Sequence, residues 1–105
     1  MKPVTISESE FEKEVINSKI PVLVDFYADW CVPCKNLDKI LNAIGAKKNG
    51  SLKIVKLDVM SAQTVAGSYM VQTLPTTILF QGGQIVSALE GLQKPKTYED
   101  LLDPL

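Results

Sequence analysis

Residues 22–35 read VLVDFYADWCVPCK and contain the clearest structural signal in the chain. The part from Val22 to Tyr27 is a nearly unbroken apolar run of strand length, which is typical of a central strand covered on both faces. Beyond this stretch, apolar residues recur at helical spacing, at Leu37, Ile40, Leu41 and Ile44. Because a helix start tolerates proline, Pro33 fits there, and we predict a strand, a short loop and an amphipathic helix.

Strand-sized and helix-sized segments alternate along the rest of the chain. Further strands are predicted at 4–6, 52–58, 76–80 and 84–89, and further helices after a capping box at 7–10, at 62–69 and from Pro95 to Leu102. The pair Gly82-Gly83 predicts a tight hairpin, which makes the last two strands antiparallel. Strands separated by helices favour parallel pairing through right-handed crossovers. The predicted fold class is therefore α/β, a mixed sheet with helices on both faces.

Length and composition exclude several classes of protein. With 105 residues the chain has room for one domain, residues 1–105, and for a core that needs no metal or structural disulfide. The formal net charge is −1 and the lysines are scattered, so nothing favours nucleic acid or an anionic membrane as a partner. No signal peptide is visible, and no apolar stretch is long enough to span a bilayer. We therefore expect a cytoplasmic protein.

The chain has two cysteines and no histidine. Neither a Ser-His-Asp nor a Cys-His catalytic site can be built without histidine. A zinc site needs about four ligands, so two thiols alone do not predict a metal centre. Haem attachment requires a histidine after the second cysteine, where this chain has Lys35. Two interpretations remain, a structural or fortuitous pair and a redox-active dithiol, and the strand-to-helix context favours the redox-active dithiol.

The dithiol Cys31–Cys34 falls at the predicted junction of strand and helix. Unpaired N–H groups and the helix dipole favour a thiolate there, and they lower a thiol pKa from about 8.5 toward roughly 7 in such motifs. Near neutral pH this thiolate is well populated and still a good nucleophile. Cys31, nearer the open end, is the predicted attacker, and Cys34, one turn inside, is predicted to resolve the mixed disulfide.

The octet at 28–35, ADWCVPCK, resembles the thioredoxin family. The resemblance extends in order over essentially the whole chain, through VDFY at 24–27, VKLD at 55–58, LPT at 74–76, and the glycines Gly82, Gly83 and Gly91. It implies a thioredoxin fold, a central mixed five-stranded sheet flanked by four helices. It also implies that the protein reduces disulfides in client proteins, is re-reduced by a thioredoxin reductase, and binds no cofactor itself. A monomer is the default expectation.

The resemblance also assigns roles to residues around the dithiol. Asp25 becomes a buried general base, which accepts the Cys34 proton through a water; burial raises the pKa of such a carboxyl. Lys56 lies near Asp25 and tempers its pKa, although strand alternation alone favours a solvated lysine. Pro75 follows a cis peptide bond that turns the Leu74 backbone toward the dithiol, where it pairs with an extended client segment.

A flat apolar docking face for clients is expected beside Cys31, formed by Trp30, Val32, Pro33, Leu74 and Gly91. Val32 is a departure, because the family's usual residue here is glycine. A stiff branched side chain beside the attacking sulfur leaves the redox potential and the client range open. Two alternatives therefore remain: the same dithiol acting as an oxidant or isomerase, and a thioredoxin-like binding subunit whose dithiol is incidental.

Overall fold

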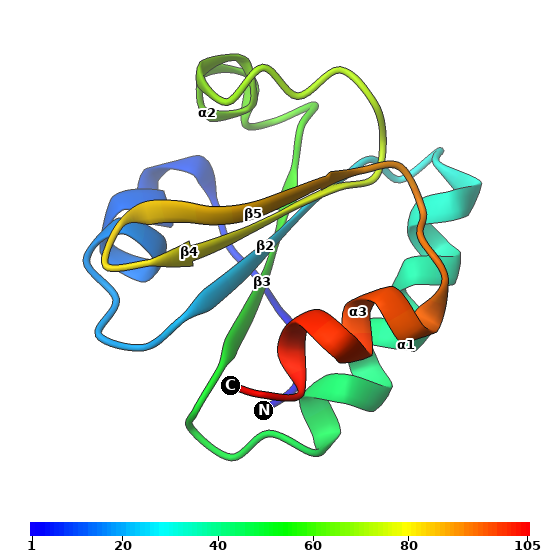
Figure 1. Ribbon diagram of the computed structural model, residues 1–105. Coiled ribbons are helices and arrows are strands. Elements are labelled where there is room, and N and C mark those ends of the chain that lie inside the picture. Colours follow the sequence, from blue (N-terminus) through cyan, green and yellow to red (C-terminus); the bar gives the residue numbers. More distant parts are fainter.

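The computed structural model describes all 105 residues and contains one five-stranded sheet in the order β1-β3-β2-β4-β5 (Figure 1). The strands are β1 (Val4–Thr5), β2 (Val22–Tyr27), β3 (Lys53–Asp58), β4 (Thr76–Gln81) and β5 (Gln84–Glu90). β2 occupies the centre, as its apolar run predicts, and its residues from Val22 to Phe26 are fully buried. The expected mixed five-stranded sheet is therefore confirmed.

The pairing directions follow from the connections between the strands. β3 runs parallel to both β1 and β2, and helices make the crossovers. β4 runs antiparallel to β2 and to β5. The β4–β5 turn uses Gly82 and Gly83, whose φ angles of 58° and 78° suit a type I′ hairpin turn. Both the parallel part and the Gly-Gly hairpin agree with the sequence prediction.

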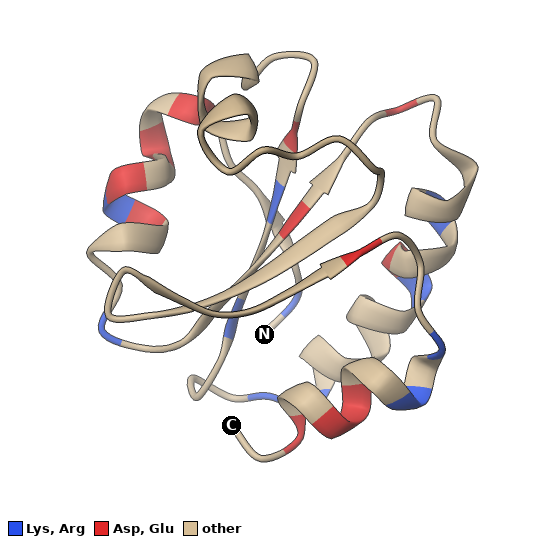
Figure 2. Ribbon diagram, turned by 45° about the horizontal axis from the view of Figure 1, so that its top comes forward, with Lys and Arg blue, Asp and Glu red and all other residues tan.

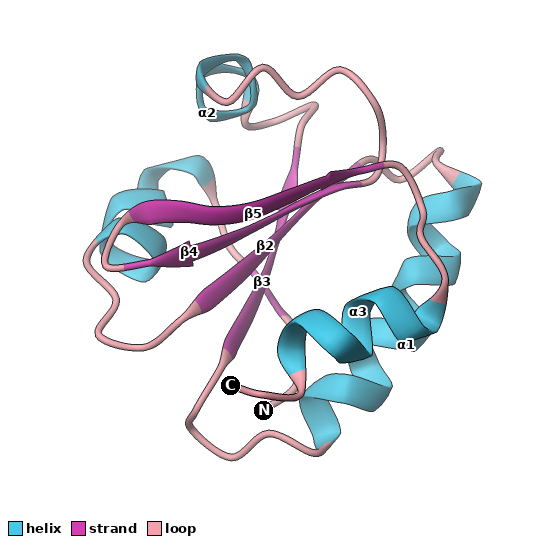
Figure 3. Ribbon diagram, in the orientation of Figure 1, coloured by secondary structure: helices cyan, strands magenta, loops and turns pink.

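Helices cover both faces of the sheet (Figure 3). On one face lie α1 (Val32–Ala46) and α3 (Pro95–Leu102), which bury Leu37, Leu41, Tyr98 and Leu102 against Leu23 and Leu79 of the sheet. On the other face lie α2 (Gln63–Ser68) and the N-terminal helical segment, which bury Ala66, Phe11 and Val15 against Val22, Val24 and Phe26. The face of β2 that contains Leu23 is therefore the one that packs against α1, the helix that follows Cys31.

The first predicted helix is irregular in the structure. It consists of a 3₁₀ turn, η1 (Glu8–Glu10), followed by a π-helical segment, η2 (Glu12–Ile16). The Ser7 N–H donates to the Glu10 carboxylate at 2.8 Å, as the capping box predicts. So short a segment has little helical stability of its own, and the burial of Phe11 and Val15 decides its shape. Three of the four expected flanking helices are therefore regular α-helices.

Acidic and basic residues are interspersed along the outer helices (Figure 2). None of the helices combines the length and the apolar character that crossing a membrane requires.

Candidate active site

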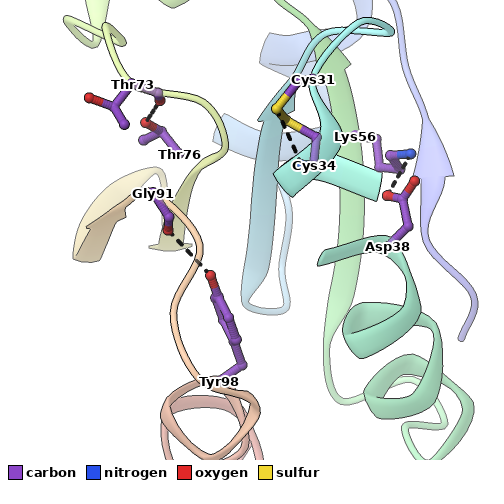
Figure 4. Close-up of a disulfide and its surroundings, with 8 residues drawn as sticks. All are labelled: Cys31, Cys34, Asp38, Lys56, Thr73, Thr76, Gly91 and Tyr98. Carbon is purple, nitrogen blue, oxygen red and sulfur yellow. Dashed lines mark hydrogen bonds and ion pairs between the residues drawn. A yellow bond between two sulfur atoms is a disulfide. The ribbon is translucent and has the colours of Figure 1, made fainter. Parts of the chain in front are cut away.

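The two cysteines lie where the central strand passes into α1. β2 ends at Tyr27, and Cys31 is the N-cap of α1. Cys31 and Cys34 form a disulfide, with their Cα atoms 5.3 Å apart (Figure 4). The Cys34 N–H donates a hydrogen bond to Cys31 Sγ at 3.2 Å. The structure thus confirms that the two sulfurs meet at a helix N-terminus.

The first turn of α1 favours negative charge on Cys31. This turn contains no acidic residue, and its free N–H groups carry the positive end of the helix dipole. Both residues are buried, with Cys34 2% exposed and Cys31 5% exposed. Cys31 is the N-cap residue, and Cys34 lies within the first turn of α1.

Asp25 lies in the layer between the sheet and α1. Side chains alternate along a strand, and Leu23 packs on the α1 and α3 side. Asp25 therefore points to the same side. Cys34 belongs to the buried side of α1, together with Leu37 and Leu41. Asp25 and Cys34 consequently both lie in the layer between the sheet and α1.

The Asp25 carboxyl is fully buried, and neither of its oxygens has a hydrogen-bond partner. Burial raises its pKa from 3.8 to about 7, against the opposing effect of Lys56 and with a further increase from Asp38. A carboxyl with this pKa exchanges its proton near neutral pH. The buried position that the sequence predicts for Asp25 is confirmed.

Lys56 lies beside Asp25 but its ammonium is engaged elsewhere. The two residues are register partners on β3 and β2. Lys56 Nζ forms an ion pair with Asp38 Oδ1 of α1 at 2.8 Å, and it lies 4.4 Å from the centre of the Tyr27 ring. The Lys56 side chain is only 19% exposed. The location that the resemblance implies is therefore correct, and the solvated position that alternation favours is not.

The loop before β4 passes close to the dithiol. The Leu74–Pro75 peptide bond is cis, as the resemblance implies. Leu74 packs against the small cluster that contains both cysteines. The Gly91 N–H donates to the Pro75 carbonyl at 2.7 Å, and Gly91 has a φ of +77°, a conformation that suits glycine. The structure thus brings Leu74, Pro75 and Gly91 together at the site.

The residues that flank Cys31 are exposed. Trp30 is 68% exposed and Val32 is 64% exposed, and Pro33 is also exposed. Large apolar side chains on a surface beside a reactive group are typical of a partner-binding face. Of the predicted docking residues, Trp30, Val32 and Pro33 therefore lie at the surface next to Cys31. Leu74 and Gly91 lie in the neighbouring loops.

Three residues of this region were not predicted from the sequence. Asp38 pairs with Lys56, as described above. Thr77 lies opposite Asp25 in the β2–β4 register, with its hydroxyl buried. The fully buried Tyr98 of α3 accepts the Gln93 N–H at 3.0 Å. Its hydroxyl also donates to the Gly91 carbonyl at 3.5 Å (Figure 4). The alignment of Thr77 with Asp25 is the one relationship that strand register could have indicated.

This geometry defines a protein with a redox-active dithiol. A model of the thioredoxin family matches residues 2–103. The chain is 35% identical to the thioredoxin of Porphyra purpurea over 98 residues, which are 93% of this chain and 92% of that protein. It is 39% identical to the thioredoxin of Haemophilus influenzae over 92 residues, 88% of this chain and 85% of that protein.

A third relative is the bifunctional thioredoxin reductase/thioredoxin of Mycobacterium leprae. The identity is 39% over 101 residues, which cover 95% of this chain and 22% of that protein. The chain belongs to the thioredoxin family. It is a thiol–disulfide oxidoreductase, a protein-disulfide reductase that works by dithiol–disulfide exchange.

Proposed function

We propose that Cys31 is the attacking sulfur and that electrons pass from this dithiol to client disulfides. The Cys31 thiolate attacks one client sulfur, forms a mixed disulfide and displaces the other client sulfur as a thiolate. The Cys34 thiolate then attacks Cys31 Sγ, closes the Cys31–Cys34 disulfide and releases the second client thiolate. Two electrons reach the client, whose disulfide becomes a dithiol. The hydrogen bond from the Cys34 N–H to Cys31 Sγ is the observation that carries this assignment.

Asp25 is the general base for the second half of this exchange. It accepts the Cys34 proton, so that Cys34 becomes the resolving thiolate. Its burial, its place in the layer beneath α1 and its pKa of about 7 support this role. Lys56 moderates the Asp25 pKa from the neighbouring strand, because a positive charge favours the carboxylate.

Clients dock on the face formed by Trp30, Val32, Pro33, Leu74 and Gly91, with Pro75 shaping the loop. The Leu74 backbone makes no backbone hydrogen bond within the chain, which leaves its N–H and C=O free for an extended client segment. Exposed apolar area at Trp30 and Val32 supplies the non-specific part of this contact.

Re-reduction by a thioredoxin reductase completes the cycle. The Mycobacterium leprae relative, whose name joins the two activities, supports this partner. We further propose that residues 1–105 act as one monomeric domain in the cytoplasm, because a reductant must work where thiols are kept reduced. The reduction potential, measured against glutathione, tests the direction. A value near −270 mV, roughly that of a reductant of this type, supports the proposal, and one near about −120 mV indicates an oxidant.

The roles of the two sulfurs are tested by trapping the mixed disulfide. Reduced Cys34→Ser and Cys31→Ser variants are mixed with a disulfide-bearing model protein and separated without reductant. We expect Cys34→Ser to accumulate a covalent adduct that dithiothreitol releases, because Cys31 attacks and nothing resolves the bond. Cys31→Ser serves as the matched control and forms little adduct. Equal trapping by both variants, or trapping by Cys31→Ser alone, would overturn the assignment.

A further inference from the structure

Two neighbouring residues of the sheet, Asp25 and Thr77, have buried polar side chains without hydrogen-bond partners. Thr77 is 2% exposed, and its hydroxyl makes no hydrogen bond. The two carboxylate oxygens of Asp25 are the only other buried side-chain oxygens or nitrogens in the chain that lack a partner. Leaving such groups unpaired costs free energy, so two of them in one place call for a functional explanation.

Strand register places these groups side by side. Asp25 of β2 is the direct register partner of Thr77 in the antiparallel β4. Directly opposite residues of such a pair have Cβ atoms roughly 4.5–5.5 Å apart and point to the same face. That face is the one under α1 and α3, because Leu23 and Leu79 of the same two strands pack there. The Thr77 hydroxyl is consequently within reach of the Asp25 carboxyl by side-chain rotation.

The other polar groups near Asp25 are already engaged. Lys56 of β3 is paired with Asp38 of α1. The Tyr98 hydroxyl of α3 donates to Gly91 and accepts from Gln93. Cys34 is held in the disulfide in this state. Thr77 is therefore the one donor beside Asp25 with no commitment elsewhere.

We propose that Thr77 is a positioning residue for proton transfer, whose hydroxyl donates a hydrogen bond to the Asp25 carboxylate and orients it toward Cys34. The proposal rests on the proposed role of Asp25 as the general base. When the proton leaves Cys34 Sγ and binds an Asp25 oxygen, the hydroxyl no longer needs to donate and can accept from the new O–H. The hydroxyl thus serves both protonation states of the base, which a rigid N–H donor cannot do.

A hydrogen bond to the charged form favours that form. Replacing Thr77 by valine keeps the shape of the side chain and removes the hydroxyl. We expect Thr77→Val to raise the pKa of Asp25 by about one unit, a roughly tenfold change in its acid dissociation constant. Two charged groups, Lys56 and Asp38, also act on the pKa of Asp25. The Thr77→Val substitution leaves both in place.

The experiment follows the Asp25 carboxyl carbon by NMR as the pH is varied, in the parent, Thr77→Val and Thr77→Ser. The pH dependence of client reduction is measured on the same proteins. We expect Thr77→Val to shift both titrations to higher pH and Thr77→Ser to match the parent. An Asp25 pKa that is the same in Thr77→Val and the parent would overturn the proposal.

Thr76→Val is the matched control. Thr76 is also buried on β4, but it lies on the other face and its hydroxyl donates to the Thr73 carbonyl. We expect Thr76→Val to lower stability and to leave the Asp25 pKa unchanged; an equal shift in both variants would overturn the specific role of Thr77. Undiminished turnover in Asp25→Asn would instead overturn the proposed general base, and the NMR comparison would still decide the hydrogen bond.

Discussion

The Lys56 ammonium lies 2.8 Å from the Asp38 carboxylate, although the register partner of Lys56 on the central strand is the buried Asp25. One positive charge therefore faces two carboxylates and is bonded to the more exposed one. Asp25 has no ion pair, and its burial raises its pKa to about 7, while Lys56 lowers this pKa and Asp38 raises it. The pKa of Asp25 thus depends in part on Asp38, a residue of α1.

Asp38→Asn should lower the pKa of Asp25. The substitution removes a negative charge that raises this pKa, and it frees the Lys56 ammonium to stabilise the Asp25 carboxylate. Both effects have the same sign, and together we expect a decrease of about one unit. Titration of the Asp25 carboxyl carbon by NMR measures it directly. Lys56→Met should move the same pKa upward.

Asp100→Asn provides the control for Asp38→Asn. Asp100 is also a helical aspartate paired with a lysine, Lys96 at 3.2 Å, but this pair is exposed on α3. Removing an exposed pair has little effect at a distance. An Asp25 pKa that moves equally in the two variants, or in neither, would contradict the account of the shared lysine.

Asp25→Asn should stabilise the oxidised protein above neutral pH while it slows turnover. Asp25 has a native pKa of about 7 against 3.8 in an unfolded chain, so between these values the folded state holds a proton that the unfolded state has lost. The Asp25 carboxyl therefore lowers the free energy of unfolding as the pH rises from about 4 to 7. Its contribution does not change further above that range. The full difference corresponds to about 4 kcal/mol at most.

Urea unfolding of parent and Asp25→Asn at pH 4 and pH 8 measures this effect. The two proteins should be of similar stability at the lower pH, and the variant should be more stable by a few kcal/mol at the higher pH, on the order of the linkage value. If the parent instead gained stability relative to Asp25→Asn between pH 4 and pH 8, the folded state could not raise the pKa of Asp25.

Tyr98→Phe should weaken client binding through the Gly91 segment. The substitution keeps the buried ring and removes the hydroxyl that accepts from Gln93 and donates to Gly91. Loss of the partner of a part-buried N–H costs about 1–3 kcal/mol of folding free energy. We expect lower stability together with a higher KM for a protein client and a nearly unchanged kcat. An unchanged KM would show that the Gly91 segment keeps its position without the tyrosine.

The sequence predicted the parts of this structure that depend on strong local patterns. The apolar run of β2, the helical spacing after Cys34 and the Gly82-Gly83 turn each allow one reading, and all three were correct. The first helix was predicted too regular, because a short segment takes its shape from packing at Phe11 and Val15.

The polar surroundings of Asp25 could not be predicted in the same way. Asp38 looks like any charged residue of an amphipathic helix, and Thr77 like any β-branched strand residue. Their importance arises only where α1, β3 and β4 meet around β2, which is a property of the tertiary structure. Resemblance located Lys56 near Asp25, but only the structure showed its bond to Asp38.

Val32→Gly should speed the reduction of bulky clients. Val32 is 64% exposed in the first turn of α1, directly beside Cys31, the proposed attacking residue, and glycine removes its branched side chain. We expect an increase of up to about tenfold in kcat/KM for a protein client, with little change for a small disulfide, and a shift of the redox potential by tens of millivolts. Identical potentials combined with identical client rates would remove Val32 from the specificity of the site.

The pH dependence of alkylation tests the central claim most directly. The reduced protein is treated with iodoacetamide over a range of pH, and modification of Cys31 is followed by mass spectrometry. A Cys31 thiolate stabilised by the N-terminus of α1 and by the Cys34 N–H should react with a midpoint near pH 7, roughly as in dithiols of this kind. A midpoint at about 8.5, the value of an ordinary thiol, would contradict the assignment of Cys31 as the activated nucleophile.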